Sequence, residues 1–105
     1  MVRGDVHAIT LSRRKGHVQR GPRYAVIVQS DALLALSTVV ICPTSQSAPT
    51  ASFHPEIDLN GESTSVMCEM AGAVDTSRLG DHVGHLTVDE MAAVDDALAL
   101  VLGLA

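Results

Sequence analysis

Two short stretches place groups that suit anion binding at the ends of apolar runs. Arg23 directly precedes the apolar run Tyr24–Val28, and Thr44 and Ser45 follow a second run, Thr38–Pro43. A guanidinium stays charged and donates two parallel hydrogen bonds to phosphate oxygens, and a hydroxyl can orient an oxygen beside it. Charged groups for chemistry are best held where a loop becomes a rigid strand. We therefore predict that the two strand ends form one site.

Short strands separated by turns must position these residues. The run Tyr24–Val28 is rich in Val and Ile, which predicts a strand buried on both faces. Asn60-Gly61 is a strong hairpin signal. The other expected segments are the strands Val2–Leu11, Thr38–Pro43, Ser52–Leu59 (at an edge) and Ser63–Val74, a short helical segment Asp31–Leu36, and Leu79–Leu86 as a short strand or turn.

The C-terminal segment predicts an amphipathic helix. Thr87 and Glu90 have the spacing of a capping box, and Gly103 ends the periodic pattern. The expected apolar stripe consists of Met91, Val94, Leu98, Val101 and Leu102. Together with the strands, this predicts one α+β domain over residues 1–105, a small β-barrel or curled sheet with a C-terminal helix.

Composition limits how this domain is built. Tyr24 and Phe53 are the only aromatic residues in 105, and there is no Trp, so Val, Ile, Leu, Ala and Met must form the core. An apolar core with few charges favours a homodimer. No segment approaches the roughly 18 apolar residues of a membrane span. Cys42 and Cys68 lie in apolar runs, which favours buried free thiols in a cytoplasmic protein, with a disulfide as the alternative.

Charge is distributed unevenly along the chain. The net charge is −5, yet six of the seven basic residues precede residue 24, and six acids lie between Asp75 and Asp96. A molecule polarised in this way can offer a basic surface to an anion, although a solvated loop and a solvated helix face would give the same pattern. The segment Ser12–Pro22 is basic and long for a connection, which is typical of functional or disordered loops.

Several short motifs, in order, resemble one known family. They are Arg3-Gly4-Asp5-Val6, Gly16 with Gln19-Arg20-Gly21 and Arg23, Gln29-Ser30-Asp31, Val39–Ser45 as VVICPTS, and a Gly-His-Leu turn into an acidic helix ending Leu-Gly-Leu. This arrangement resembles the MazF/PemK family, the toxins of bacterial toxin–antitoxin pairs. The resemblance implies an SH3-like small β-barrel of the CcdB/MazF type. It also implies a homodimer that cleaves single-stranded RNA to 2′,3′-cyclic phosphate and 5′-OH ends, without metal or cofactor. Such a toxin inhibits translation and growth until a MazE-like antitoxin neutralises it.

The resemblance also implies roles for individual residues. Arg23 and Thr44 would be catalytic, with Arg23 stabilising the phosphorane and donating the leaving-group proton. The family's substrate loop would be Gly16–Gly21, which gives Gly16, His17, Gln19, Arg20 and Gly21 as substrate-binding residues, and the positions of Ser45 and Glu69 in this sequence add those two. The acceptor of the 2′-hydroxyl proton stays open between His17 and Glu69. We expect Glu69 in mid-strand facing the RNA groove, where it accepts a proton or binds a base edge, or else pairs with a buried arginine.

Departures from the family pattern leave alternatives open. Tyr24 replaces the usual proline, His7 replaces an aromatic residue, and Gly16-His17-Val18-Gln19 lacks the usual hydroxyl and acid. The RNA motif therefore does not transfer from the family. The alternatives are a gyrase-binding toxin on the same barrel and a catalytically silent barrel that binds RNA or an antitoxin. His54, His82 and His85 show no metal-ligand spacing and are expected at the surface or in packing.

Overall fold

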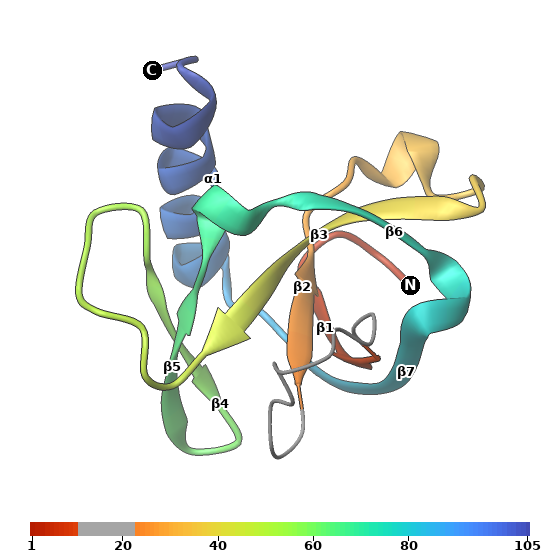
Figure 1. The fold of residues 1–105 in the computed structure, drawn as a ribbon, viewed down its shortest axis with the longest axis horizontal. Helices are drawn as coiled ribbons and strands as arrows, with labels where there is room; N and C mark the ends of the chain where they lie inside the picture. Colours follow the sequence, from red (N-terminus) through yellow and green to blue (C-terminus); the bar gives the residue numbers. More distant parts are fainter. Residues whose placement is uncertain (11–22) are drawn as a thin grey trace, which may run out of the picture.

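A strongly curled antiparallel sheet carries one C-terminal helix in the computed structural model, which describes residues 1–10 and 23–105 (Figure 1). The strands are β1 (Asp5–Ile9), β2 (Tyr24–Ile27), β3 (Thr38–Ser45), β4 (Glu56–Leu59), β5 (Glu62–Val66), β6 (Gly72–Asp75) and β7 (Leu79–His85). Three 3-10 turns, η1 (Asp31–Leu33), η2 (Cys68–Met70) and η3 (Thr76–Arg78), and the helix α1 (Val88–Leu102) complete the described fold. The sheet order is β4-β5-β3-β2-β1-β7, and β6 also pairs with β3. This confirms the predicted α+β class with a curled sheet and a C-terminal helix.

β3 joins the two halves of the sheet. Its first half pairs with β6, with Val39 opposite Val74, and its last two residues pair with β5, with Thr44 opposite Val66. Its other edge pairs with β2. A strand that serves three neighbours must twist along its length, which curls the sheet. β3 extends to Ser45, so the prediction that the strand stops at Pro43 was wrong.

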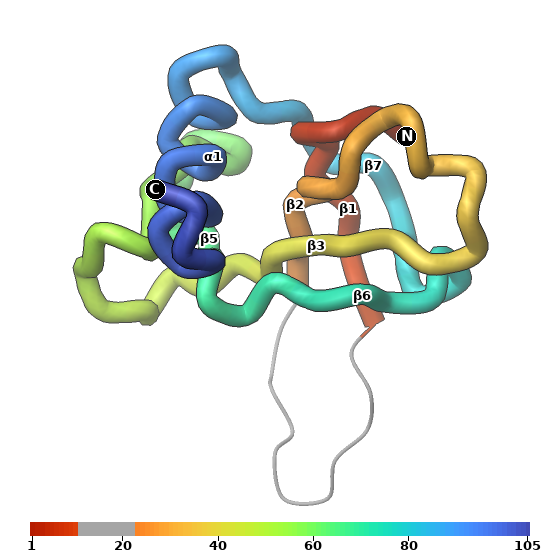
Figure 2. Tube along the Cα trace, turned by 90° about the horizontal axis from the view of Figure 1, so that it is seen from above, coloured from red at the N-terminus to blue at the C-terminus, as the bar shows by residue number. Residues whose placement is uncertain are grey.

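Side-chain alternation along β2 and β3 builds two apolar clusters. Val26 and Cys42 are fully buried on the face covered by α1, where they join Val94 of the helix. Ala25 and Ile27 are fully buried on the opposite face. Burial on both faces agrees with the continuous apolar run that predicted β2. Figure 2 shows α1 to one side of β1, β2 and β3.

The segment expected as one strand from Ser63 to Val74 is broken by a turn. β5 ends at Val66, η2 follows, and β6 begins at Gly72. The Met67 amide donates to the Pro43 carbonyl at 2.9 Å, and the Cys68 amide donates to the Phe53 carbonyl at 3.3 Å. These tertiary hydrogen bonds redirect an apolar sequence that carries no turn residue before Gly72. The remaining segments differ from expectation mainly in length: β1 and β4 are shorter than predicted, the segment expected at Asp31–Leu36 is only η1, and Leu79–Leu86 is largely the strand β7.

The hairpin between β4 and β5 forms at the predicted place. Leu59 pairs with Glu62 across the turn, and Asn60 and Gly61 both adopt positive φ, 54° and 85°. Two-residue hairpins need this left-handed backbone, which Asn and Gly adopt most readily. The Asn60-Gly61 prediction is confirmed.

Both ends of α1 are as predicted. The Glu90 amide donates to Thr87 Oγ1 at 3.1 Å, and the Thr87 amide donates to Glu90 Oε1 at 2.9 Å. The second oxygen of Glu90 accepts from the Asp58 amide at 2.7 Å, which ties the helix to the hairpin. Gly103 closes the helix with φ of 72°. In the described ranges of the chain, no helix combines the length and apolarity needed to cross a membrane.

Thr87→Ala should destabilise the fold because it removes the side-chain acceptor for the Glu90 amide. We expect a loss of about 1 kcal/mol in the free energy of unfolding, measured by urea denaturation. Thr87→Ser keeps the hydroxyl and is the matched control, expected to stay within a few tenths of a kcal/mol of the wild type. Equal losses in both variants would mean that the cap is not what stabilises this end.

Candidate functional site

Arg23 lies directly before β2 and is half-buried. Its carbonyl accepts from the Ile9 amide at 2.9 Å, which fixes the backbone against β1. The side-chain Nε is buried, and no acceptor in the described residues lies within hydrogen-bond distance of it. No described carboxylate forms an ion pair with this arginine. A buried donor that stays unpaired costs free energy, which makes this nitrogen a candidate for a ligand contact.

Thr44 is buried within β3, with 5% of its surface exposed. Its hydroxyl donates to the Tyr24 carbonyl at 3.2 Å. Ala25 pairs with Pro43 in this antiparallel pair of strands, so the bond joins the neighbouring residues Tyr24 and Thr44. The structure therefore brings Thr44 against the backbone of the residue that follows Arg23. Because the hydroxyl proton is directed at Tyr24, the oxygen keeps its lone pairs for an incoming donor.

The remaining predicted substrate-binding residues divide into two groups. Ser45 is half-buried, and its Oγ accepts from the Ser47 amide at 3.2 Å, so it caps the turn after β3. The predictions for Gly16, His17, Gln19, Arg20 and Gly21 fall outside the described residues. Among the basic residues before residue 24, Arg3 forms an ion pair with Asp95 of α1 at 2.7 Å, so it serves the fold and not an open basic surface.

Glu69 lies on η2 and pairs with a histidine. The expectation of a mid-strand position was wrong because η2 breaks the strand there, and among the described residues His54, not an arginine, pairs with Glu69. His54 Nε2 lies 2.6 Å from Glu69 Oε2, and His54 Nδ1 lies 2.7 Å from the Pro49 carbonyl oxygen. The His54 side chain is 4% exposed and that of Glu69 is 35% exposed. The hydrogen bond to Pro49, followed by that to Glu69, raises the pKa of His54 above its usual 6.5, although burial opposes the shift.

His54 is a buried packing residue, as one of the two expectations had it, but its pairing with Glu69 was not predicted. Fifteen residues separate it from Glu69, and no motif spacing links the two. The contact arises because the Cys68 amide bonds to Phe53, which brings η2 beside the segment before β4. Phe53 also packs edge-on against the imidazole, with ring centroids 4.6 Å apart. Only the folded chain reveals this pair.

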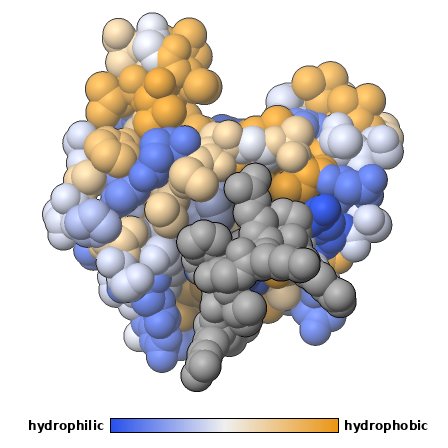
Figure 3. Space-filling model, in the orientation of Figure 1, coloured by the Kyte–Doolittle hydropathy of each residue, from blue (hydrophilic) through white to orange (hydrophobic). Residues whose placement is uncertain are grey.

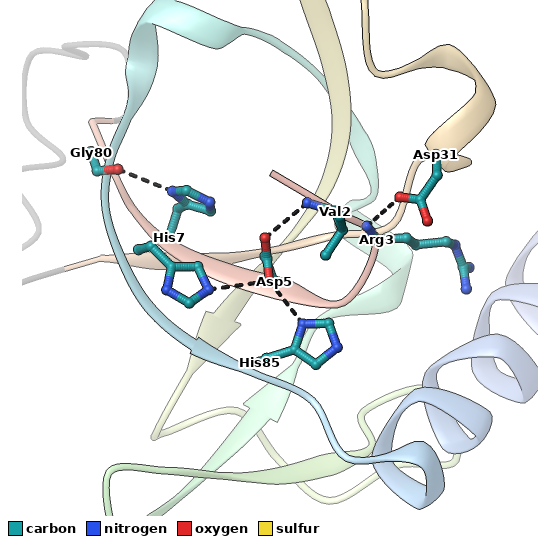
Figure 4. A network of polar contacts seen from close by, with 8 residues as sticks. Val2, Arg3, Asp5, His7, Asp31, Gly80 and His85 are labelled. Atoms are coloured by element: carbon teal, nitrogen blue, oxygen red, sulfur yellow. Dashed lines mark hydrogen bonds and ion pairs between the residues drawn. The ribbon is translucent and has the colours of Figure 1, made fainter.

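A second polar cluster surrounds the buried carboxylate of Asp5 (Figure 4). Asp5 Oδ1 accepts from His82 Nε2 at 3.1 Å and from His85 Nδ1 at 2.8 Å, and Oδ2 accepts from the Val2 amide at 2.8 Å. Burial alone would raise the pKa of Asp5, but these hydrogen bonds outweigh it and lower the pKa to about 2. His82 and His85, which were expected to be surface or packing residues, therefore join β7 to the start of β1.

Metal-ligating groups are not clustered in the described parts of the chain: no three His, Cys, Asp or Glu side chains there are arranged to hold an ion. Cys42 and Cys68 are both buried and free, which agrees with the preferred expectation over a disulfide. The hydrogen bond with Cys68, together with burial, raises the pKa of the Cys42 thiol above its usual range.

Comparison with known proteins places this arrangement in a family. Residues 2–102 match the family described as PemK-like, MazF-like toxin of type II toxin-antitoxin system. A Mycobacterium tuberculosis protein named as a candidate toxin, Rv3098A, is 37% identical over 106 residues, which cover 99% of each chain. The chain therefore belongs to the PemK/MazF toxin family, as the motifs predicted.

Solved structures share the fold at low identity. The MazE–MazF complex of Deinococcus radiodurans superposes with a TM-score of 0.82 at 22% identity, covering 100% of this chain and 97% of that one. A mycobacterial endoribonuclease in complex with its cognate antitoxin gives 0.80 at 23% identity, covering 100% and 97%. The Mycobacterium tuberculosis toxin MazF-mt6 gives 0.80 at 16% identity, covering 96% and 98%. The curled sheet with its C-terminal helix is thus the MazF fold.

Proposed function

We propose that this protein is an endoribonuclease toxin that cleaves single-stranded RNA without a metal ion, with Arg23 and Thr44 as its catalytic residues. The observation that carries the proposal is the buried Nε of Arg23, which lacks an acceptor among the described residues, on the residue directly before Tyr24, whose carbonyl accepts from Thr44. A guanidinium with free donors suits the charge that develops on phosphate oxygens during transfer. The family match and the solved structure described as an endoribonuclease in complex with its antitoxin support the same activity.

The proposed reaction is an internal transfer at phosphorus. The ribose 2′-oxygen attacks the adjacent phosphorus, the bond to the 5′-oxygen breaks, and a 2′,3′-cyclic phosphate and a 5′-hydroxyl result. Arg23 would stabilise the phosphorane and donate the proton that the 5′-oxygen takes up. Thr44 would orient a phosphate oxygen or the attacking 2′-hydroxyl. The 2′-hydroxyl proton would pass to His17 or Glu69, the two candidates from the sequence.

The 2′-hydroxyl requirement gives the direct test of this reaction class. The purified protein should cut a mixed-sequence RNA pool in EDTA, and should leave a DNA pool of the same sequences intact. The RNA fragments should carry cyclic phosphate at one end and a 5′-hydroxyl at the other. Cutting of both pools would contradict internal transfer. Binding of RNA without cutting would favour the catalytically silent barrel, and inhibited supercoiling would favour the gyrase-binding alternative.

Thr44→Val tests the catalytic role of the hydroxyl apart from its role in packing, because valine has nearly the same shape as threonine. We expect kcat to fall by about 10²-fold, the scale of one lost transition-state hydrogen bond. The lost bond to Tyr24 should cost only about 1 kcal/mol of stability. Thr44→Ser keeps the hydroxyl and should retain most activity. Single-turnover cleavage with saturating RNA measures both, and equal rates for Val and Ser would remove Thr44 from the mechanism.

The assembly and regulation proposed for the toxin follow from its surface and its relatives. We propose one toxin domain over residues 1–105 that acts as a cytoplasmic homodimer and is neutralised by a MazE-like antitoxin. Apolar side chains are exposed near the end of α1 and around η1, where Figure 3 shows orange surface. These residues include Leu33, Leu36, Leu100, Leu102 and Leu104. Exposed apolar surface of this kind is typical of interaction sites, and two structural relatives are complexes with an antitoxin or with MazE.

A further inference from the structure

The pair formed by His54 and Glu69 holds a proton that geometry requires. His54 Nδ1 faces the Pro49 carbonyl at 2.7 Å, and a carbonyl oxygen only accepts, so Nδ1 must carry hydrogen. A neutral imidazole would then turn the lone pair of Nε2 toward Glu69 Oε2 at 2.6 Å. Two hydrogen-bond acceptors repel each other at that distance unless a hydrogen lies between them. One further proton must therefore lie between His54 and Glu69.

This proton belongs to the imidazole. The hydrogen bond to Pro49 and the contact with Glu69 raise the pKa of His54, which favours an imidazolium facing a carboxylate. The other titratable group that acts on His54 is the buried thiol of Cys68. Glu69 Oε2 lies 2.6 Å from His54 Nε2, so this contact fixes the carboxylate in place as a hydrogen-bond acceptor.

The pair lies beside the proposed catalytic strands. η2 follows β5, whose Val66 is opposite Thr44, and the Met67 amide donates to the Pro43 carbonyl at 2.9 Å. The Glu69 side chain is 35% exposed while the His54 side chain is buried, so His54 contacts the carboxylate from the interior of the protein. No described residue donates to the second oxygen, Oε1. A fixed acceptor is thus available to a ligand near the end of β3.

We infer that His54 is a positioning residue that fixes the Glu69 carboxylate as an acceptor for the exocyclic amino group of one unpaired base beside the cleaved bond. Adenine, cytosine and guanine carry such a group, and uracil does not. Uracil places carbonyl oxygens on both sides of its N3–H, and these repel a carboxylate. The pair would therefore disfavour uracil at one position of the substrate. This inference rests on the proposed nuclease function.

Two variants at His54 separate its two hydrogen bonds. In His54→Asn the amide nitrogen replaces Nδ1 and keeps the bond to Pro49, whereas in His54→Gln it replaces Nε2 and keeps the bond to Glu69. We expect Glu69→Ala and His54→Asn to relax the bias against uracil by about tenfold at the same position. His54→Gln should retain most of the bias. The readouts are sequencing of cut sites in a mixed RNA pool and KM against kcat on matched oligonucleotides, with the main effect on KM.

A measurement without RNA tests the proton itself. Ring nitrogen NMR of the wild type should show both His54 nitrogens protonated at pH 7, and Glu69→Ala should lower the protonated fraction of the ring at that pH. RNA affinity of the wild type should fall as pH rises through the raised pKa of His54, and that of Glu69→Ala should not. A neutral His54 in the wild type, or an unchanged base preference in both Glu69→Ala and His54→Asn, would overturn the inference. A wild type that cuts no RNA would instead count against the proposed function, while the NMR result would still decide the state of the pair.

Discussion

Arg23→Ala is expected to reduce RNA cleavage by at least about 10³-fold, because it removes both the fixed charge and the donors aimed at the phosphorane. The side-chain Nε has no acceptor among the described residues, so no hydrogen bond to them engages this donor in the described fold. Single-turnover cleavage with saturating RNA is the measurement. The loss should appear mainly in kcat, since the interaction strengthens as charge develops on the phosphate.

Two controls distinguish this role from a structural one. Arg23→Lys keeps the charge but not the planar fork, so its activity should be intermediate. The melting temperature of Arg23→Ala should not fall, because no bond to a described residue is lost and a costly buried donor is removed. Cleavage within tenfold of the wild type, or a strong loss of stability, would show that Arg23 mainly supports the fold.

Asp5→Asn is expected to lower the free energy of unfolding at pH 7 by about 2 kcal/mol. The hydrogen bonds from Val2, His85 and His82 lower the pKa of Asp5 from 3.8 to about 2 despite its burial. A shift of this size corresponds to about 2 kcal/mol of preference for the charged form in the folded state. Urea denaturation of both proteins is the measurement. Asp96→Asn changes an exposed carboxylate of α1 and is the matched control, expected to have little effect.

The pH dependence of this effect has a defined sign. The folded pKa of Asp5 is depressed, so its stabilisation is complete above about pH 4 and is lost as pH falls toward 2. The difference in the free energy of unfolding between the wild type and Asp5→Asn should therefore disappear as pH falls across that interval. A stability difference that stays constant from pH 7 to pH 2 would mean that the charge of Asp5 is not what the network stabilises.

Local sequence signals predicted the features that depend on local chemistry. The Asn60-Gly61 hairpin and the Thr87 capping box form as predicted because the residues that define each turn also make its hydrogen bonds. The apolar run Tyr24–Val28 was enough to predict a central strand, because a strand that is buried on both faces needs apolar residues at every position. The family was predicted from the order of short motifs, and residues 2–102 match it.

Features that depend on contacts between distant segments were not predicted. The break at η2 arises from hydrogen bonds to Pro43 and Phe53, which the apolar sequence around Cys68 does not reveal. The same break moves Glu69 from a strand to a turn and gives it His54 as a partner. Thr44 was expected after a strand, yet pairing with Val66 keeps it within β3. In each case the partner lies ten or more residues away.

The most direct test of the account compares the wild type with Arg23→Ala on one mixed-sequence single-stranded RNA pool in EDTA. The wild type should yield fragments with cyclic phosphate and 5′-hydroxyl ends, and the variant should leave the RNA intact. Equal cutting by both folded proteins would place the chemistry elsewhere. Intact RNA with both, from a pool that contains every short motif, would contradict the nuclease function.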